Sequence, residues 1–274
     1  MANNQNLSRR AMLRQQQELE QQRRRRNRVI GIGAGIVALA LIVVIAVVAI
    51  PPILNNQGIE VTKDQKTPPN ATAAGGIMQD GKMPTDGVPN VIVYTDFQCP
   101  YCAEYEATYG PAFAELVEQG KITVEHRTAY FLDGDKPGAS HRAAIAAATA
   151  DAFGKYRQYA DVLFQNQNSH FPEKDLRETF AKQAGIEGED LKQFQELLRT
   201  RAYQDFTKKA HDDFLNSGAT GTPTYVVNGQ RLVFGDPETK QRFIQPDAAS
   251  LLDAITKAQE GTEAPTHRPL GEEE

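Results

Sequence analysis

The chain has 274 residues and a formal net charge of −5, and 40% of its residues are hydrophobic, which is enough for a substantial core. It contains only two cysteines, Cys99 and Cys102. This count excludes a framework of several disulfides and a zinc site built from two cysteine pairs. The five histidines are scattered without the close His–His spacing of a zinc site, so we expect no metal and no cofactor.

Positive charge is concentrated at the N-terminus. Residues 1–28 contain eight arginines and two glutamates, a net charge of +6, so the remainder carries −11. Residues 29–50 follow without a charged side chain and, at about 1.5 Å per residue, would span a hydrocarbon core of about 30 Å. The positive-inside rule then predicts a cytoplasmic segment 1–28, an uncleaved transmembrane helix 29–50 and an extracytoplasmic remainder. Nucleic-acid binding is the alternative role of the arginines, but their position beside the apolar segment favours topology.

The next segments lead into a folded domain. Residues 51–75 are polar and contain consecutive prolines, which indicates a flexible tether. Ile77 and Met78 predict a short first strand of a domain that begins near residue 76. Residues 91–97, Val-Ile-Val-Tyr-Thr-Asp-Phe, are β-branched and aromatic, and they predict a buried strand.

The two cysteines follow this strand directly, in the sequence Cys99-Pro100-Tyr101-Cys102. Disulfides stabilise mainly by restricting long loops of the unfolded chain, and a loop of two intervening residues restricts almost nothing. The pair is therefore expected to serve redox chemistry. Two buried, inert cysteines are the alternative.

A helix is predicted after the pair, extending to about Gln119, with Gly120 as its C-cap. Cys99 would lie just before or at the helix start, where unpaired backbone N–H groups and the helix dipole stabilise an anion such as a thiolate. Pro100 suits the first turn because its missing N–H is not needed there. We expect Cys99 to be the exposed nucleophile and Cys102 to point inward as the resolving cysteine.

Residues 122–127 alternate between apolar and polar side chains, as a strand does. Apolar residues then recur at helical spacing over about 137–217 and predict a set of helices. The aromatic side chains within this region are interpreted as core residues and not as a cofactor site.

A second motif, Gly221-Thr222-Pro223-Thr224, opens a predicted strand at 224–228. A proline at the start of a strand fits an edge strand or a cis peptide bond, although an ordinary loop proline would have the same sequence. The turn Asn228-Gly229 and residues 231–233 complete a predicted hairpin.

The end of the chain contains one more predicted element. Residues 247–258 form a closing helix, with Pro246 and Asp247 as its start signal. The folded domain would therefore extend from 76 to about 260. The acidic tail 261–274 is predicted to be disordered.

Together these motifs resemble the DsbA-like thiol–disulfide oxidoreductases of bacterial envelopes, within the thioredoxin superfamily. The matching stretches are Asp96-Phe97-Gln98-Cys99-Pro100-Tyr101-Cys102, Ser140-His141-Arg142-Ala143-Ala144, Leu163-Phe164-Gln165-Asn166-Gln167 and Gly221-Thr222-Pro223-Thr224. The resemblance covers about 75–260 and implies an α/β thioredoxin fold interrupted by a helical insertion. It also implies that Cys99 attacks and Cys102 resolves, that Pro223 is a cis-proline facing the pair, and that the Thr222 backbone pairs with substrate.

Two positions depart from the family pattern. Thioredoxin and several relatives have a buried acid six residues before the first cysteine, where this chain has Val93. A proton acceptor for Cys102 would then have to be Asp96, Glu125 or water. The dipeptide Pro100-Tyr101 also differs from the Pro-His of the best-known strong oxidants and matches that of glutaredoxins, which lowers the expected oxidising strength.

The expected function is oxidation of cysteines in exported proteins by a Cys99–Cys102 disulfide, in a single-pass membrane protein. The resemblance implies reoxidation by a membrane partner, either DsbB-like or vitamin-K-epoxide-reductase-like. We expect a monomer that binds no nucleic acid. A membrane-tethered reductase or isomerase is the alternative, although no dimerisation segment supports an isomerase, and a non-enzymatic binding or chaperone module is a further one.

Overall fold

The computed structural model describes residues 61–134, 136–236 and 238–271. The predicted basic segment 1–28 and the predicted transmembrane helix 29–50 lie outside these residues. Among the helices of the described ranges, none combines the length and the apolar character needed to cross a membrane.

The described residues form a six-stranded sheet with the strand order β1-β3-β2-β4-β5-β6. The strands are β1 (Ile77–Met78), β2 (Asn90–Thr95), β3 (Thr123–Thr128), β4 (Thr224–Val227), β5 (Gln230–Leu232) and β6 (His267–Pro269). Strands β2 and β3 are parallel, with Val93 opposite His126, and the other neighbouring pairs are antiparallel. The predicted strands and the predicted hairpin are confirmed, with ends shifted by up to two residues.

Seven α-helices accompany the sheet in the described part of the chain. They are α3 (Pro100–Glu118), α4 (Ala139–Asp151), α5 (Tyr156–Gln165), α6 (Phe180–Gln183), α7 (Gly188–Arg199), α8 (Gln204–Asn216) and α9 (Ala248–Glu260). Helix α3 ends as predicted, since Gly120 adopts φ +67° directly after the C-cap. Helix α9 begins where the Asp247 carboxylate accepts a hydrogen bond from the backbone N–H of Ser250 at 2.9 Å.

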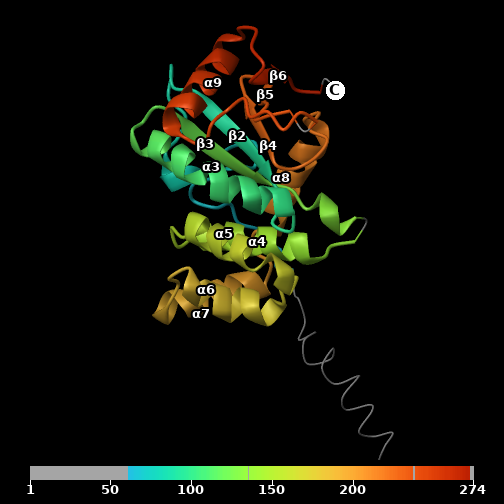
Figure 1. Cartoon of the computed structure of the whole chain (residues 1–274). Coiled ribbons are helices and arrows are strands. Elements are labelled where there is room, and N and C mark those ends of the chain that lie inside the picture. The colour runs from blue at the N-terminus through green and yellow to red at the C-terminus, as the bar shows by residue number, and fades with distance from the viewer. Residues whose placement is uncertain (1–60, 135, 237, 272–274) are drawn as a thin grey trace, which may run out of the picture. The chain divides into compact units, whose positions relative to one another are not determined.

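Successive side chains of the central strand β2 point to opposite faces of the sheet. Val91 and Val93 belong to the core shared with α3 and α9, whereas Tyr94 packs against Phe214 of α8 on the other face. Figure 1 shows α4 and α5 as a further layer, with α6 and α7 beyond them. The predicted helical insertion at about 137–217 is therefore confirmed as α4 to α8, between the β2-α3-β3 unit and the β4-β5-α9 unit.

The segment before β1 differs from the expected flexible tether in its described part. Lys66 donates its backbone N–H to the carbonyl of Ala202 at 2.7 Å. The Asn70 backbone and side-chain amides both donate to the Asp151 carboxylate, each at 2.9 Å. The polar residues that indicated a solvated tether instead supply hydrogen bonds to the helical insertion.

The C-terminal tail also differs from the expected disorder. Strand β6 pairs with β5, and the Leu270 N–H donates to the carbonyl of Gly229 at 2.9 Å. Leu270 also packs against the cluster that contains Tyr94 and Phe214. The prediction is wrong for residues 261–271, because this segment pairs with a strand that would otherwise be an unpaired sheet edge.

Candidate active site

The cysteine pair lies where β2 passes into α3. Cys99 occupies the N-cap position of α3 with an extended backbone, φ −72° and ψ 117°, and Pro100 stands in the first turn. A hydrogen bond of 3.0 Å from the Cys99 N–H to the Asp96 carbonyl closes the turn before the helix. The predicted helix-start position of Cys99 is confirmed.

Both cysteines are free thiols and both are buried, with 5% of Cys99 and 2% of Cys102 exposed. The expectation of an exposed Cys99 is therefore wrong in this state. The segment before β4 covers the sulfur, and Cys99 Sγ donates to the Thr222 carbonyl oxygen at 3.1 Å. Any substrate sulfur must displace this contact, or approach beside it, to reach Cys99.

The structure brings the two distant motifs together. The Thr222–Pro223 peptide bond is cis, as the resemblance implied. The contact between Cys99 and Thr222 joins residues 123 positions apart in the sequence. The pairing of the Thr222 backbone with substrate stays a prediction.

The surroundings of the two thiols separate their acidities. The pKa of Cys99 is lowered from 9.0 to about 6, first by a hydrogen bond from the Cys102 thiol. The Thr222 side chain and the backbone N–H groups of Cys102 and Tyr101 lower it further. Burial raises the pKa of Cys102 far above its ordinary value, and the adjacent Cys99 raises it further. These opposite shifts favour ionisation of Cys99 over Cys102, as expected if Cys99 is the nucleophile, and that role stays a prediction.

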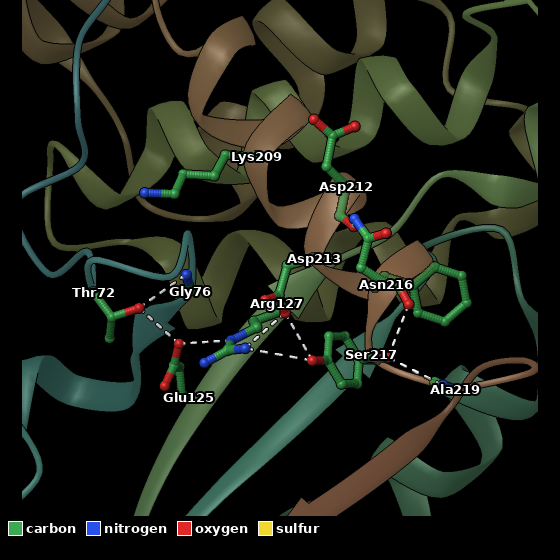
Figure 2. Close-up of polar contacts among 12 residues, drawn as sticks. Thr72, Gly76, Glu125, Arg127, Lys209, Asp212, Asp213, Asn216, Ser217 and Ala219 are labelled. Carbon is green, nitrogen blue, oxygen red and sulfur yellow. Dashed lines mark hydrogen bonds and ion pairs between the residues drawn. The ribbon is translucent and has the colours of Figure 1, made fainter. Parts of the chain in front are cut away.

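Glu125 is not placed to accept a proton from Cys102. Figure 2 shows its carboxylate held by Arg127 and Thr72, with hydrogen bonds of 2.8 and 2.6 Å. Val93 lies in the apolar core beneath α3 and provides no acid. Of the two side chains considered from the sequence as proton acceptors for Cys102, only Asp96 remains.

Asp96 is fully buried three residues before Cys99. Its carboxylate accepts hydrogen bonds from the Ser140 hydroxyl at 2.6 Å and from the backbone N–H groups of Gln98 and Leu132. Burial nevertheless raises the pKa of Asp96 to about 6. Asp96 can therefore gain or lose a proton in the same pH range as Cys99.

A cleft opens beside the cis-proline. It has a volume of about 240 Å³ and is lined by Tyr101, Tyr105, Pro223 and Phe234 among others. Tyr101 is 64% exposed, and the rings of Tyr105 and Phe234 meet edge to face at 5.0 Å. Sequence reasoning identified Tyr101 and Pro223 but not the other two, which were interpretable only as ordinary aromatic residues of a helix and a loop.

The Thr222 hydroxyl is expected to tune the Cys99 thiolate. It is buried without a hydrogen-bond partner and lies close enough to the sulfurs to lower the pKa of both cysteines. Thr222→Val keeps the shape but removes the donor, so the pKa of Cys99 should rise by up to about one unit. Thiolate absorbance of the reduced protein, followed against pH, measures this shift.

Thr224→Val is the matched control, because the Thr224 hydroxyl donates to the Gly221 carbonyl at 2.8 Å. It should leave the Cys99 titration unchanged. Equal shifts in the two variants would show that the loop, and not the Thr222 hydroxyl, sets the acidity of Cys99.

Comparison with known proteins gives the family. A family model described as thioredoxin matches residues 85–246, more than half of the chain. A probable disulfide bond formation protein D of Bacillus cereus is 25% identical over 216 residues, which cover 77% of this chain and 92% of that protein. The Na(+)/H(+) antiporter NhaA 3 of Salinispora tropica is 29% identical over 188 residues, 68% of this chain, and the chain spans only 26% of that relative's length.

Solved structures support the same fold. The MdbA protein of Actinomyces oris, a thiol-disulfide oxidoreductase, superimposes with a TM-score of 0.55 at 16% identity, covering 74% of this chain and 98% of that one. The MdbA protein of Corynebacterium diphtheriae gives a TM-score of 0.52 at 21% identity, covering 64% and 93%. With the family model matching across the cysteine pair and the cis-proline, the chain belongs to the thioredoxin family.

Proposed function

We propose that the chain is an extracytoplasmic protein thiol–disulfide oxidoreductase that oxidises the cysteines of exported proteins. The observation that carries the proposal is the asymmetry of the pair: a Cys99 of lowered pKa at the helix start, and a buried Cys102 of raised pKa beside it. The names of its relatives, a probable disulfide bond formation protein and two thiol-disulfide oxidoreductases, support the same activity.

The oxidised protein would react in two exchange steps. A substrate thiolate attacks the Cys99 sulfur, a substrate–Cys99 disulfide forms, and the Cys102 sulfur leaves and takes up a proton. A second substrate thiolate then attacks the substrate sulfur of that mixed disulfide and releases Cys99 as a thiolate. Two electrons pass from the substrate to the cysteine pair, and the low pKa of Cys99 makes it a good leaving group.

The lowered pKa also favours the oxidising direction. Interactions that stabilise the Cys99 thiolate stabilise the reduced protein, which makes the disulfide a stronger oxidant. No buried acid at position 93 opposes this effect, since Val93 is apolar. A reductase, which would run the same exchange backwards, needs a more stable disulfide than these surroundings favour.

The cleft beside Pro223 is the proposed substrate site. Its lining mixes aromatic rings with polar side chains such as those of Thr224 and Arg231, so the cleft suits an extended peptide segment beside the reacting cysteine. Tyr101, between the two cysteines, also belongs to the lining. Exported proteins that have not yet folded present such segments. The predicted membrane anchor would hold this site near a DsbB-like or vitamin-K-epoxide-reductase-like partner that reoxidises the pair.

The proposal is tested by measuring both directions of catalysis and the reduction potential. We expect the oxidised protein to restore activity to reduced ribonuclease, and the reduced protein to be a poor catalyst of insulin reduction. The potential should lie between about −180 and −120 mV, the range from protein disulfide isomerase to DsbA. A potential near the value of about −270 mV for thioredoxin, with fast insulin reduction, would establish the reductase instead.

A further inference from the structure

The helical insertion contacts the active-site loop through side chains from the two sequence motifs that the exchange chemistry does not use. From the first motif, the Ser140 hydroxyl donates to the Asp96 carboxylate at 2.6 Å. From the second motif, the Gln167 side-chain amide reaches the backbone that flanks Gln98. The insertion thus contributes directly to the geometry of the cysteine pair.

The Gln167 side-chain amide makes two hydrogen bonds to the active-site loop. Its Nε2 donates to the Phe97 carbonyl and to the Cys99 carbonyl, each at 2.8 Å. A primary amide has two N–H donors, so both are used on carbonyls two residues apart in one turn. The Cys99 carbonyl also accepts the N–H of Cys102 at 3.1 Å, which is the first turn of α3.

We propose that Gln167 is a positioning residue for Cys99: its amide fixes the two carbonyls around Gln98, and so holds Cys99 in the extended N-cap conformation that starts α3. In this conformation the Cys99 sulfur lies next to the first N–H groups of the helix and to the Cys102 thiol. These two hydrogen bonds go to the loop backbone and not to a sulfur, and Gln167 is not among the residues that line the cleft, so we expect its effect to pass through the loop backbone.

Loss of the Gln167 amide is expected to destabilise mainly the reduced protein with an ionised Cys99. The backbone N–H groups of Tyr101 and Cys102 help to lower the pKa of Cys99, and they do so only while Cys99 keeps its place at the helix start. Without the Gln167 amide, two carbonyls lose a donor and the loop gains alternative conformations. The thiolate then loses part of its stabilisation, whereas a closed Cys99–Cys102 disulfide holds the loop by its own covalent ring.

The test compares Gln167→Met with Gln165→Met. Methionine has nearly the length of glutamine but no N–H donor, and Gln165 is an exposed residue two positions earlier with none of these contacts. In Gln167→Met the pKa of Cys99, followed by thiolate absorbance, should rise by roughly one unit, the worth of one or two hydrogen bonds. The thiolate fraction at pH 6 would fall from about one half to about one tenth, and Gln165→Met should titrate like the wild type.

The second readout is the exchange equilibrium with glutathione. The reduced form of Gln167→Met should lose stability relative to the disulfide, and its equilibrium constant at pH 7 should shift roughly five-fold toward a weaker oxidant. Gln167→Asn, which keeps the NH₂ group but withdraws it by one methylene, should give an intermediate shift. It serves as the second variant if Gln167→Met unfolds.

The outcomes separate this inference from the proposed function, on which it rests only in taking Cys99 as the attacking cysteine. A lower melting temperature with an unchanged Cys99 titration and an unchanged glutathione equilibrium would make Gln167 merely structural and overturn the inference. A wild-type pair that does not exchange with glutathione at all would overturn the proposed function instead.

Discussion

Cys99→Ser is expected to abolish thiol–disulfide exchange, whereas Cys102→Ser should leave Cys99 able to attack disulfides and to accumulate as mixed disulfides. The reason is the divided acidity of the pair, with the pKa of Cys99 lowered to about 6 and that of Cys102 raised by burial. At pH 7 most of Cys99 would be thiolate, against a few per cent of an ordinary thiol with a pKa of about 8.5. Without Cys102, no internal thiol can release the substrate.

The pH dependence of alkylation gives the sharpest measurement. A group with a lowered pKa is protonated only as the pH falls through that value, so the rate at Cys99 should climb between about pH 5 and 7 and then level off. Mass spectrometry after brief iodoacetamide treatment identifies the modified cysteine, and the double serine variant is the unreactive control. Faster modification of Cys102 than of Cys99 in the reduced protein would reverse the assigned roles.

The local part of this site was predictable from the sequence because it depends on adjacent residues. A β-branched strand, a proline in the first turn and Gly120 at the end define α3 and place Cys99 at its start. The approach of Thr222 to Cys99 was not derivable in this way, since the two residues are joined only by the fold. Family resemblance supplied that link, but not the burial of Cys99 beneath the Thr222 carbonyl.

Segments outside the core were harder to predict from the sequence, for a related reason. Composition reports whether a segment is polar, and not whether its polar groups bond to water or to the protein. Asn70 was interpretable as part of a solvated tether, yet it binds Asp151. Gln167 lay within a matched motif, but the two backbone carbonyls that it reaches could not be foreseen, because hydrogen bonds from side chain to backbone leave no periodic pattern.

A buried charge network joins the sheet to α8 on the face away from α3. Figure 2 shows Arg127 of β3 between two carboxylates, Glu125 of the same strand and Asp213 of α8. Arg127 Nε donates to Glu125 at 2.8 Å, and its NH1 group donates to Asp213 at 2.6 Å. The Tyr94 hydroxyl also donates to Asp213, at 2.7 Å. The chain leaves α8 at Asn216 and reaches Thr222 six residues later, so this network anchors the helix from which the cis-proline segment extends.

Arg127→Met should therefore lower the free energy of unfolding by about 3 kcal/mol or more, because it leaves two carboxylates without their cation, and one of them, Glu125, is buried. Arg157→Met is the matched control, because the Arg157 side chain is 46% exposed and its NH1 group lies 3.8 Å from the Asp80 carboxylate. This substitution should lower the free energy of unfolding by less than about 1 kcal/mol. Urea denaturation of the oxidised proteins at pH 7 measures both values. Similarly small losses in the two variants would mean that the buried network stabilises the fold no more than an exposed ion pair does.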